Sequence, residues 1–594
     1  MKKIISMVLL LVLLQQLTFA QPIGKEWLKE HYTKTEVRIP MRDGVSLYTS
    51  IYTPTQINGK RPIIMHRTPY GCKPYGEDFR MLKEFRNYYL HDYIIVMQDV
   101  RGRFMSEGEF INVEERPEDT WDTVEWLLEN VPENNGRVGM TGFSYPGYFA
   151  LMGALSRHPA IKAVAPQAPI SDWYMGDDIH HNGVLMLLDS YCFGRNFFRD
   201  CPNPTPSMPP FEDTIDKPVY DYFLEKRTFR NISATFPEPL PFWESLATHP
   251  DYDDYWKAKN VTEELTDIHA AMLVVGGSYD TDDCYGALQT YRNIKSHSPA
   301  TTLHLVYGPW YHGSWRSEAT YLDDIEFPFF EHYLCDEPYE LPAVTVIPSQ
   351  HSRGDQPEPV VKHQQALKLK MTELPDTEAA ARSYYLTGRG RLTSRPPLRG
   401  TSKSSCYTSD PSNPVPHFGQ SICKKDKRYM IADQRFASKR KDVLSFAGAP
   451  LSDTLKIIGT PEVDLYVCSS TPDADFVVKI IDVAPSGHEM LVRWDVMRAR
   501  YRDGFSHPVP MTPNQATRIC FRLPDIAHYF LPGHRLMIQI QSSFFPAIDL
   551  NPGTFLNNIY EAEPSDFVKY DIRILHSQEH PSRIILPIFG TLEF

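Results

Sequence analysis

The chain is long, acidic and moderately apolar, with 594 residues, a formal net charge of −13 and a hydrophobic content of 42%. This length predicts about two to four domains, and the apolar fraction is sufficient for a buried core in each. The negative charge argues against nucleic acid or an anionic membrane as a partner, because neither supplies cations to an acidic surface.

The amino-terminal residues follow the order of a secretory signal. Met1-Lys2-Lys3 precedes a mostly apolar run from Ile4 to Leu14, and Thr18-Phe19-Ala20 ends the segment. The apolar run is too short for a membrane-crossing helix, which needs about 20 apolar residues, and no later stretch approaches that length. We therefore expect cleavage near Ala20 and an exported protein, periplasmic or secreted, with no membrane span.

Short apolar runs alternate with helical patterns over the next part of the chain. The runs at residues 62–65, 93–97 and 138–141 are typical of buried strands, and apolar residues recur at helical spacing between 121 and 131. Further runs of the same character lie at residues 272–275 and 303–307. The alternation predicts a parallel sheet with helices on both faces, formed by residues 21–168 and 267–342.

Two other segments differ from this pattern in their composition. Residues 169–266 are rich in aromatic residues and prolines without strand alternation, and we expect an inserted cap over the carboxyl ends of the strands, where ligands bind. Later residues form short β-prone runs between turns. These runs predict an all-β domain over residues 343–594, a sandwich or a jelly roll, and they lie at residues 455–458, 463–467, 476–480 and 536–540.

Nine cysteines are spread along the chain without any Cys-x-x-Cys pair, so a structural zinc site built from cysteines is not expected. Export would permit disulfides. The nearest-spaced candidates are Cys192 with Cys201 and Cys406 with Cys423, and spacing alone leaves their pairing open.

One serine lies in a glycine-rich turn between a predicted strand and a predicted helix. The turn reads Gly142-Phe143-Ser144-Tyr145-Pro146-Gly147. Glycines give room at a sharp turn, so this arrangement predicts a nucleophile elbow that holds the Ser144 hydroxyl toward a substrate. The usual pattern is Gly-x-Ser-x-Gly, whereas here the second glycine comes one place later. The alternative is an ordinary turn in which the serine caps the helix.

A serine nucleophile needs a histidine to accept its proton and a carboxylate to orient that histidine. In a fold of this kind the partners follow the serine in the order aspartate then histidine, each just after a strand. Asp280 follows the run at residues 272–275, and His312 follows the run at residues 303–307. We therefore predict that Ser144, Asp280 and His312 form a catalytic triad. The alternative is that Asp280 and His312 are structural.

The reaction also needs hydrogen-bond donors for the negative charge that forms on the carbonyl oxygen. The backbone N–H of Tyr145, the residue after the serine, is the expected first donor. The second donor should come from the loop after an early strand, Arg67-Thr68-Pro69-Tyr70-Gly71, where the phenol of Tyr70 could donate. From the spacing alone, it is equally consistent that the Tyr70 ring only packs along the side of the site and donates no hydrogen bond.

Five motifs in order resemble those of the X-Pro dipeptidyl-peptidase and cocaine-esterase family of serine hydrolases. The resemblance spans nearly the whole chain after the signal and implies an α/β-hydrolase core, a helical cap and a carboxyl-terminal jelly roll. It implies Ser144, Asp280 and His312 as the triad and Tyr70 with the Tyr145 amide as oxyanion donors, without a metal or cofactor. In the family the second glycine of the turn stands where Gly147 stands here. The motifs are Arg67-Thr68-Pro69-Tyr70, Asp99-Val100-Arg101-Gly102 with Ser106-Glu107-Gly108, the Ser144 turn, Gly277-Ser278-Tyr279-Asp280 and Gly308-Pro309-Trp310-Tyr311-His312.

Three further carboxylates resemble a cluster in the α-amino acid ester hydrolases of this family, where such groups bind the α-ammonium group of the substrate. They are Asp178 in the cap and Asp282 with Asp283 after the triad aspartate, where those enzymes usually have Glu-Asp. Converging carboxylates repel one another by about 4 kcal/mol per pair at roughly 4 Å and an effective dielectric near 20, so a cation would stabilise them. The alternative is that Asp282 and Asp283 cap the following helix.

The neighbouring pair His180 and His181, next to Asp177 and Asp178, suggests a metal site at first sight. Adjacent residues rarely point into one coordination sphere, and a serine mechanism needs no metal, so we expect none there.

We therefore expect a serine hydrolase that forms an acyl-enzyme with esters or amides of α-amino acids and transfers the acyl group to water or to amines such as β-lactam nuclei. Its expected partner is a small molecule or short peptide with a free α-amino group. The alternatives are a dipeptidyl peptidase that cleaves after Xaa-Pro, a carboxylesterase without amino-group recognition and, from another class, a non-catalytic binding protein. α-Amino acid ester hydrolases are tetrameric, so the resemblance also suggests a homo-oligomer.

Overall fold

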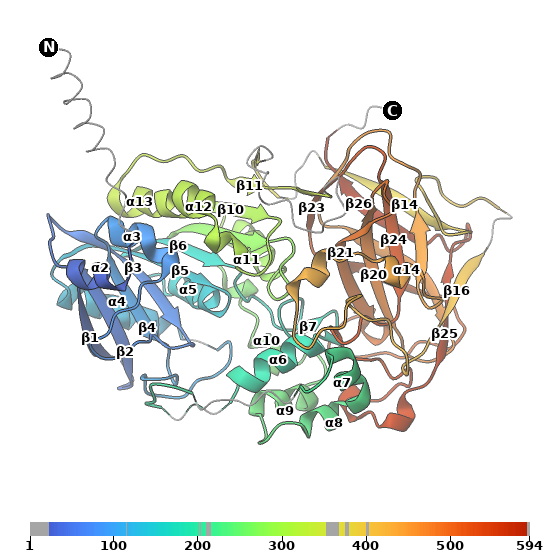
Figure 1. Ribbon diagram of the computed structural model, residues 1–594, viewed down its shortest axis with the longest axis horizontal. Helices are drawn as coiled ribbons and strands as arrows, with labels where there is room; N and C mark the ends of the chain where they lie inside the picture. Colours follow the sequence, from blue (N-terminus) through green and yellow to red (C-terminus); the bar gives the residue numbers. More distant parts are fainter. Residues whose placement is uncertain are drawn as a thin grey trace, which may run out of the picture.

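The computed structural model describes residues 23–114, 116–199, 201, 203–208, 215–351, 368–374, 379–399 and 403–590. The expected signal segment, residues 1–20, lies outside these described residues. Among the described residues we find no helix with the length and apolar character that crossing a membrane requires. Figure 1 shows an α/β part beside a β part, with small helices along the lower edge between them.

A ten-stranded sheet forms the framework of the α/β part. It contains β1 (Tyr32–Pro40), β2 (Ser46–Pro54), β3 (Arg61–Thr68), β4 (Ile94–Asp99), β5 (Asn134–Phe143), β6 (Ile161–Gln167), β9 (Ala271–Gly277), β10 (Leu303–Gly308), β11 (Val344–Val346) and β13 (Leu369–Met371). The central strands run parallel in the order β4-β3-β5-β6-β9-β10-β11. The pairings at the edges, β1 with β2, β2 with β4 and β11 with β13, are antiparallel. The five apolar runs predicted as strands all lie in this sheet.

Helices cover both faces of this sheet because successive side chains of its strands point to opposite sides. Ile63 and Met65 of β3 pack in one apolar cluster with α4 (Pro117–Asn130) and α5 (Tyr145–Leu155). Ile64, between them, packs in another cluster with α3 (Arg86–Leu90) and α13 (Phe327–Cys335). The predicted three-layer α/β core is therefore confirmed. Further helices of this part are α2 (Lys25–His31), α11 (Gly286–His297) and α12 (Ala319–Tyr321).

The cap lies between β6 and β9 in the chain. It contains a hairpin of β7 (His180–His181) and β8 (Val184–Leu185), followed by α6 (Leu187–Phe197), α7 (Val219–Lys226), α8 (Phe229–Ser233), α9 (Pro241–Thr248) and α10 (Asp254–Lys257). Phe198 stacks on Phe242 with ring centroids 3.9 Å apart. Phe242 belongs to the same buried cluster as Val138 of the sheet. The cap therefore shares its apolar core with the α/β part.

The β part is built from fourteen strands around a separate apolar core. The four runs predicted as strands lie in β18, β19, β20 and β24, and this part corresponds to the expected all-β domain (Figure 1). A short helix, α14 (Arg435–Ser438), lies among them. The strands are β12 (Ser349–Gln350), β14 (Ala380–Thr387), β15 (Arg391–Thr393), β16 (Ser404–Ser409), β17 (Leu444–Ala447), β18 (Leu455–Gly459), β19 (Glu462–Ser469), β20 (Asp475–Val483), β21 (Glu489–Arg498), β22 (Thr517–Arg522), β23 (Ile526–Phe530), β24 (Arg535–Gln541), β25 (Tyr570–Leu575) and β26 (Arg583–Ile588).

A buried arginine fastens the cap to the β part. Arg498 is fully buried and forms ion pairs with Asp475 at 2.8 Å and Asp549 at 2.9 Å. Asp549 also accepts the backbone N–H of Leu185 in the cap hairpin, at 3.1 Å. Removing one member would leave buried charges without a partner, which is strongly destabilising. The cap is therefore held between the α/β part and the β part.

The predicted domain boundary after residue 342 falls too early. β11 pairs with β10, and β13 pairs with β11, so residues 344–346 and 369–371 complete the first sheet. Between them, β12 pairs with β23 of the β part. The chain therefore crosses from one sheet to the other within a few residues. The other domain boundaries stay predictions.

The two candidate disulfides do not form in the part of the chain that the structure describes. No disulfide joins Cys192 to Cys201 or Cys406 to Cys423. Cys406 lies exposed on β16, where its partner across the ladder is Arg573 of β25.

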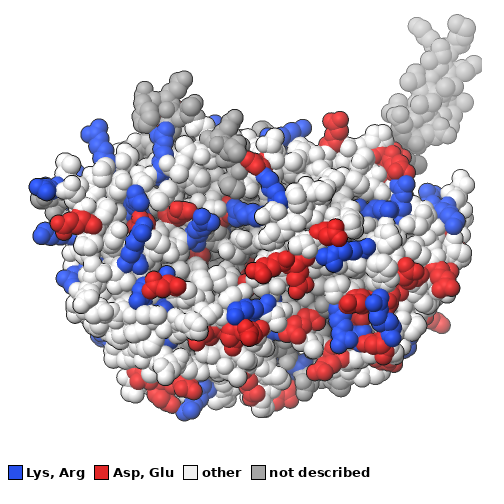
Figure 2. Space-filling view, turned by 180° about the vertical axis from the view of Figure 1, so that it is seen from behind, with Lys and Arg blue, Asp and Glu red and all other residues white. Residues whose placement is uncertain are grey.

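Charges of both signs are interspersed on the face shown in Figure 2. Neighbouring opposite charges form ion pairs over the protein surface, as Arg42 and Asp122 do at 2.7 Å. On this face the acidic groups are not gathered into one patch.

Candidate active site

Ser144 stands at the junction of β5 and α5 in an unusual backbone conformation. Its φ of 63° and ψ of −128° lie in a region that residues with a side chain rarely adopt. A Cβ at position 142 would lie 2.0 Å from the carbonyl oxygen of Pro146, and one at position 147 would lie 2.7 Å from that of Gln167. Both glycines are required by this close approach, and Pro146 falls in the first helical turn, where proline is tolerated.

Asp280 and His312 meet beyond the carboxyl ends of β9 and β10. The Nδ1 atom of His312 lies 2.9 Å from each carboxylate oxygen of Asp280. Asp280 is fully buried, and its Oδ1 also accepts the backbone N–H groups of Asp282 at 2.9 Å and Asp283 at 3.2 Å. These bonds fix the carboxylate, so the imidazole keeps its proton on Nδ1 and presents Nε2 as the proton acceptor.

A cavity of about 570 Å³ brings the predicted groups together. Ser144, His312 and Tyr70 line this cavity. The His312 ring packs against Phe143, the neighbour of Ser144, with ring centroids 4.4 Å apart. The cavity opens at the carboxyl ends of the parallel strands, where α/β sheets bind ligands. The arrangement can therefore support nucleophilic attack by a serine hydroxyl on a bound carbonyl group.

The two residues predicted to supply oxyanion donors, Tyr70 and Tyr145, both line this cavity. The Tyr70 side chain is 43% exposed and follows β3. Partial loss of hydration, with the negative charges of Asp178 and Asp283, raises the pKa of the Tyr70 phenol, so it remains protonated and can donate. Tyr145 is the first residue of α5, where the backbone N–H has no acceptor within the helix. Its own phenol oxygen is engaged elsewhere, accepting the backbone N–H of Val113 at 2.9 Å.

The loop that carries Tyr70 is held by Asp99, at the end of β4. One carboxylate oxygen of Asp99 accepts the backbone N–H of Cys72 at 2.7 Å. The other accepts the phenol O–H of Tyr75 at 2.9 Å. Asp99 is fully buried, so these bonds satisfy a charge that would otherwise be costly to place there. The Asp99 motif therefore positions the Tyr70 loop and does not itself line the cavity.

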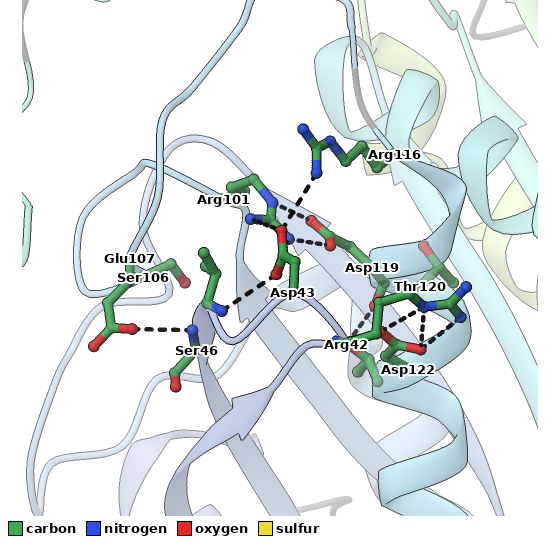
Figure 3. Close-up of polar contacts among 12 residues, drawn as sticks. Arg42, Asp43, Ser46, Arg101, Ser106, Glu107, Arg116, Asp119, Thr120 and Asp122 are labelled. Carbon is green, nitrogen blue, oxygen red and sulfur yellow. Dashed lines mark hydrogen bonds and ion pairs between the residues drawn. The ribbon is translucent and has the colours of Figure 1, made fainter.

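Figure 3 shows how the rest of that motif is tied to the sheet. Arg101 donates to Asp119 of α4 at 2.6 Å and pairs with Asp43 at 2.9 Å. Glu107 accepts the backbone N–H of Ser46, at the start of β2, at 3.0 Å. Gly102 has a φ of 69°, and a Cβ there would lie 2.1 Å from a backbone nitrogen. These contacts indicate that the motif has a structural role, which is to hold this loop against α4 and the start of β2.

The three carboxylates predicted to bind an ammonium group take different positions. Asp178 and Asp282 line the cavity, whereas Asp283 does not. Asp283 is fully buried, its carboxyl oxygens have no hydrogen-bond partner among the described residues, and one of them lies 3.7 Å from Nδ1 of His312. Burial and then the charge of Asp178 raise its pKa well above the usual range. Asp283 thus does not line the cavity with the other two carboxylates, and its role in binding an ammonium group stays a prediction.

The two carboxylates that line the cavity differ in charge state. Burial and then the negative charge of Asp282 raise the pKa of Asp178 to about 7. Burial alone would raise the pKa of Asp282, but the positive charges of Lys425 and His312 together outweigh it and lower that pKa below the usual range. At neutral pH Asp282 is therefore ionised, and Asp178 is close to its titration midpoint.

Sequence reasoning missed Lys425, whose ammonium group lies among these carboxylates. Its Nζ is 2.8 Å from Asp189 of α6 and also donates to Oδ1 of Asp282. Lys425 belongs to the β part and comes from a loop far along the chain from the triad. The signal that could have found it is the basic run Lys424-Lys425-Asp426-Lys427-Arg428 in an acidic protein. The β part thus contributes a charge directly to the cavity.

A second lysine of the same loop contacts His312. Lys427 Nζ donates to the backbone carbonyl oxygen of His312 at 3.0 Å. On the other side, Oδ2 of Asp282 lies 3.6 Å from His312 Nε2. Burial works against the imidazolium, but the charges of Asp280 and Asp282 outweigh it and raise the pKa of His312, while Lys427 lowers it. The proton affinity of His312 is therefore set by charges from both parts of the molecule.

The other polar residues at the start of the cap are structural. One oxygen of Asp177 accepts the backbone N–H groups of Ser171 at 2.8 Å and Asp172 at 2.9 Å. His180 Nε2 lies 2.9 Å from the Tyr560 hydroxyl, and His181 Nδ1 lies 3.0 Å from Asp495. The two histidines therefore point to partners in the β part and not to a shared ligand with Asp177.

Comparisons with known proteins agree with these features along most of the chain. Residues 43–314 match the X-Pro dipeptidyl-peptidase (S15 family). Residues 350–585 match the X-Pro dipeptidyl-peptidase C-terminal non-catalytic domain. The first match contains Ser144, Asp280 and His312, and the second contains Lys425 and most of the β part.

Three similar proteins extend over almost the full length. The chain is 28% identical to the cocaine esterase of Rhodococcus sp. (strain MB1 Bresler), with 93% of this chain and 98% of that protein aligned. Its structure is similar to an aminopeptidase from a marine sediment archaeon, Thaumarchaeota archaeon, with 31% identity, 94% and 97% coverage and a TM-score of 0.86. It is equally similar to a solved α-amino acid ester hydrolase, with 30% identity, 96% and 99% coverage and a TM-score of 0.86.

The charges around His312 predict opposite pH shifts for two substitutions. An ester substrate should be cleaved faster as the pH rises through the pKa of His312, because the neutral imidazole accepts the serine proton. Asp282→Asn removes a charge that raises this pKa, so the acidic limb of kcat/KM should move to lower pH. Lys427→Met removes a charge that lowers it, so the limb should move to higher pH. The pH profile of initial rates checks both signs, and shifts in one common direction would contradict the assignment.

Proposed function

Because the chain belongs to the X-Pro dipeptidyl-peptidase (S15) family of serine hydrolases, we propose that it cleaves esters or amides of α-amino acids through an acyl-enzyme formed on Ser144. Its class as an esterase or peptidase follows from the family and its relatives. The substrate class and the roles of individual residues are our proposal. The observation that carries it is the position of Asp178 and Asp282 on the wall of the cavity that Ser144 and His312 line.

In the proposed mechanism, Ser144 Oγ attacks the substrate carbonyl carbon while His312 Nε2 takes the hydroxyl proton. Asp280 stabilises the resulting imidazolium, and the oxyanion accepts hydrogen bonds from the Tyr70 phenol and the Tyr145 N–H. His312 then gives the proton to the departing alcohol or amine, which leaves an acyl group on Ser144. A water molecule, or another amine, repeats the sequence and releases the acyl group.

The acyl group should carry a free α-ammonium group because the cavity wall offers it negative charge. Asp282 is ionised, and Asp178 titrates near neutral pH, so a cation beside it would favour its ionised form. One such contact contributes about 1.5 to 3 kcal/mol, which is the usual range for a hydrogen bond to a charged group. The similarity to a solved aminopeptidase and to a solved α-amino acid ester hydrolase supports the same proposal.

The position of Lys425 among the carboxylates supports a second candidate function. Its ammonium group already neutralises part of the negative charge by contacting Asp189 and Asp282. If this internal cation filled the role of the substrate cation, the enzyme would be a carboxylesterase without amino-group recognition, as the similarity to a cocaine esterase also suggests. The lysine binds Oδ1 of Asp282, whereas Oδ2 faces His312 Nε2 at 3.6 Å. We favour amino-group recognition because Asp178 and Asp282 both line the cavity.

The proposal predicts a preference for free amino groups that depends on Asp178. Phenylglycine methyl ester should be cleaved with a kcat/KM about 10- to 100-fold above that of its deaminated analogue, the phenylacetate ester, as expected for one charged hydrogen bond. Asp178→Asn should remove most of this ratio and leave cleavage of the deaminated ester nearly unchanged.

The deaminated ester is the internal control for each variant, since it lacks the ammonium group and adds no bulk. Initial rates over a range of substrate concentrations give both constants. Equal kcat/KM for the two esters would exclude amino-group recognition and would support the second candidate function, a carboxylesterase. Hydrolysis restricted to Xaa-Pro dipeptide amides would favour the dipeptidyl peptidase instead.

Lys425→Met should strengthen the preference for a free amino group. The variant removes a positive charge that repels the ammonium group of the substrate. Two unit charges about 7 Å apart interact by roughly 2 kcal/mol at an effective dielectric near 20. We expect the KM of the amino ester to fall about 30-fold while that of the deaminated ester changes little. A lower ratio of the two kcat/KM values would show instead that Lys425 is needed to hold Asp282 in place.

Export after cleavage near Ala20 and assembly into a tetramer stay predictions of the sequence.

A further inference from the structure

Four histidines and one aspartate gather in the β part, outside the cavity that contains Ser144. Asp482 lies near the end of β20 and His528 on β23, while the other histidines lie in the turns next to β12, β21 and β24. All five are at least nine-tenths buried. One candidate ligand atom from each of His351, Asp482 and His534 lies within 4.8 Å of the others. The five residues are His351, His488, His528, His534 and Asp482.

Asp482 is held from two sides. Its Oδ2 lies 3.0 Å from Nε2 of His528, and its Oδ1 lies 2.7 Å from Nδ1 of His534. The second ring nitrogen of His528 lies 2.7 Å from the Ser349 hydroxyl, which in turn accepts the Tyr279 phenol at 2.7 Å. Both nitrogens of His528 therefore have partners, and this histidine orients the carboxylate.

His351 differs from His528 because neither of its ring nitrogens has a hydrogen-bond partner among the described residues. It is 3% exposed and stacks on His488, with ring centroids 4.8 Å apart and an interplanar angle of 15°. A neutral imidazole has one N–H donor and one lone pair, and burying both without a partner is costly. Beside His351 lie a second imidazole and a carboxylate, which are groups that bind metal ions.

We propose that His351, His534 and Asp482 bind a divalent transition-metal ion, with Zn²⁺ as the expected species. Two imidazoles and one carboxylate form a common donor set for Zn²⁺, which completes its coordination with water or another side chain. Ca²⁺ and Mg²⁺ prefer sites made entirely of oxygen ligands, so the two histidines disfavour them. His528 supplies the outer hydrogen bond that a ligating carboxylate usually receives.

The site lies where the chain crosses between the two sheets. β11 pairs into the first sheet, β12 pairs into the second, and His351 follows β12 directly. An ion bound by His351, Asp482 and His534 fastens this crossover to β20 and β24. The hydrogen bond that Tyr279 donates to Ser349 extends the link to the residue next to Asp280. The ion thus stabilises the junction of the two parts, and this role does not rest on the proposed catalytic function.

The full chain, produced without a histidine tag, tests the proposal by its metal content. After equilibrium dialysis against Zn²⁺, the wild type should retain one more ion per chain than His351→Ala and His534→Ala. Co²⁺ in place of Zn²⁺ should give visible absorption bands typical of nitrogen ligation, and both variants should lose them. Zn²⁺ should raise the Tm of the wild type, whereas Mg²⁺ at the same concentration should not.

His417→Ala is the matched control. His417 is buried in the β part and its Nε2 has no hydrogen-bond partner, yet it belongs to no group of candidate ligands among the described residues. This variant should retain the ion. His528→Ala should bind Zn²⁺ about 10- to 100-fold more weakly, as expected for loss of an outer hydrogen bond. Any ion held by Asp280, Asp282 and His312 is common to all these proteins and cancels in the comparison.

The proposal is overturned if the wild type retains no Zn²⁺ and shows no cobalt bands. It is also overturned if His351→Ala and His534→Ala retain as much metal as the wild type. His351→Gln preserves most of the side-chain volume and repeats the comparison if the alanine variant does not fold, as judged by circular dichroism.

Discussion

The hydrogen bond between Asp280 and His312 is the interaction on which the rest of the active site depends. It forms because β9 and β10 are parallel neighbours, so the turns after them meet at one edge of the sheet. The Ser144 turn after β5 and the Tyr70 loop after β3 reach the same edge. Once Asp280 holds Nδ1 of His312, every nearby charge acts on the proton affinity of a single nitrogen, Nε2.

The charged groups in and beside the cavity come from three segments that lie far apart in the sequence. The cap supplies Asp178 and Asp189, the turn after β9 supplies Asp282, and the β part supplies Lys425 and Lys427. The β part is therefore a component of the site and not an appended module. The β part must be held in place for its lysines to reach the cavity. The ion pair of Arg498 with Asp549 fastens it to the cap. In our account, the balance between Lys425 and the carboxylates decides how strongly a substrate cation is attracted.

Much of this arrangement could be predicted from local patterns. The strand runs, the glycines around Ser144 and the order of Asp280 and His312 each depend on neighbouring residues, and all of them are found where the patterns indicate. Other features depend on distant contacts. Lys425 reaches the cavity through the packing of two domains, and the direction of Asp283 depends on the turn that follows Asp280. The histidine group around Asp482 is drawn from four separate strands or turns, so no spacing in the sequence indicates it.

In the proposed mechanism Ser144 is the nucleophile, and covalent labelling can identify the nucleophile of the protein. A fluorophosphonate probe reacts only with an activated serine, and mass spectrometry of the digested protein locates the adduct. We expect one adduct per chain on Ser144, which is lost in Ser144→Ala together with ester hydrolysis. An adduct on another serine, or hydrolysis by Ser144→Ala at the wild-type rate, would contradict it.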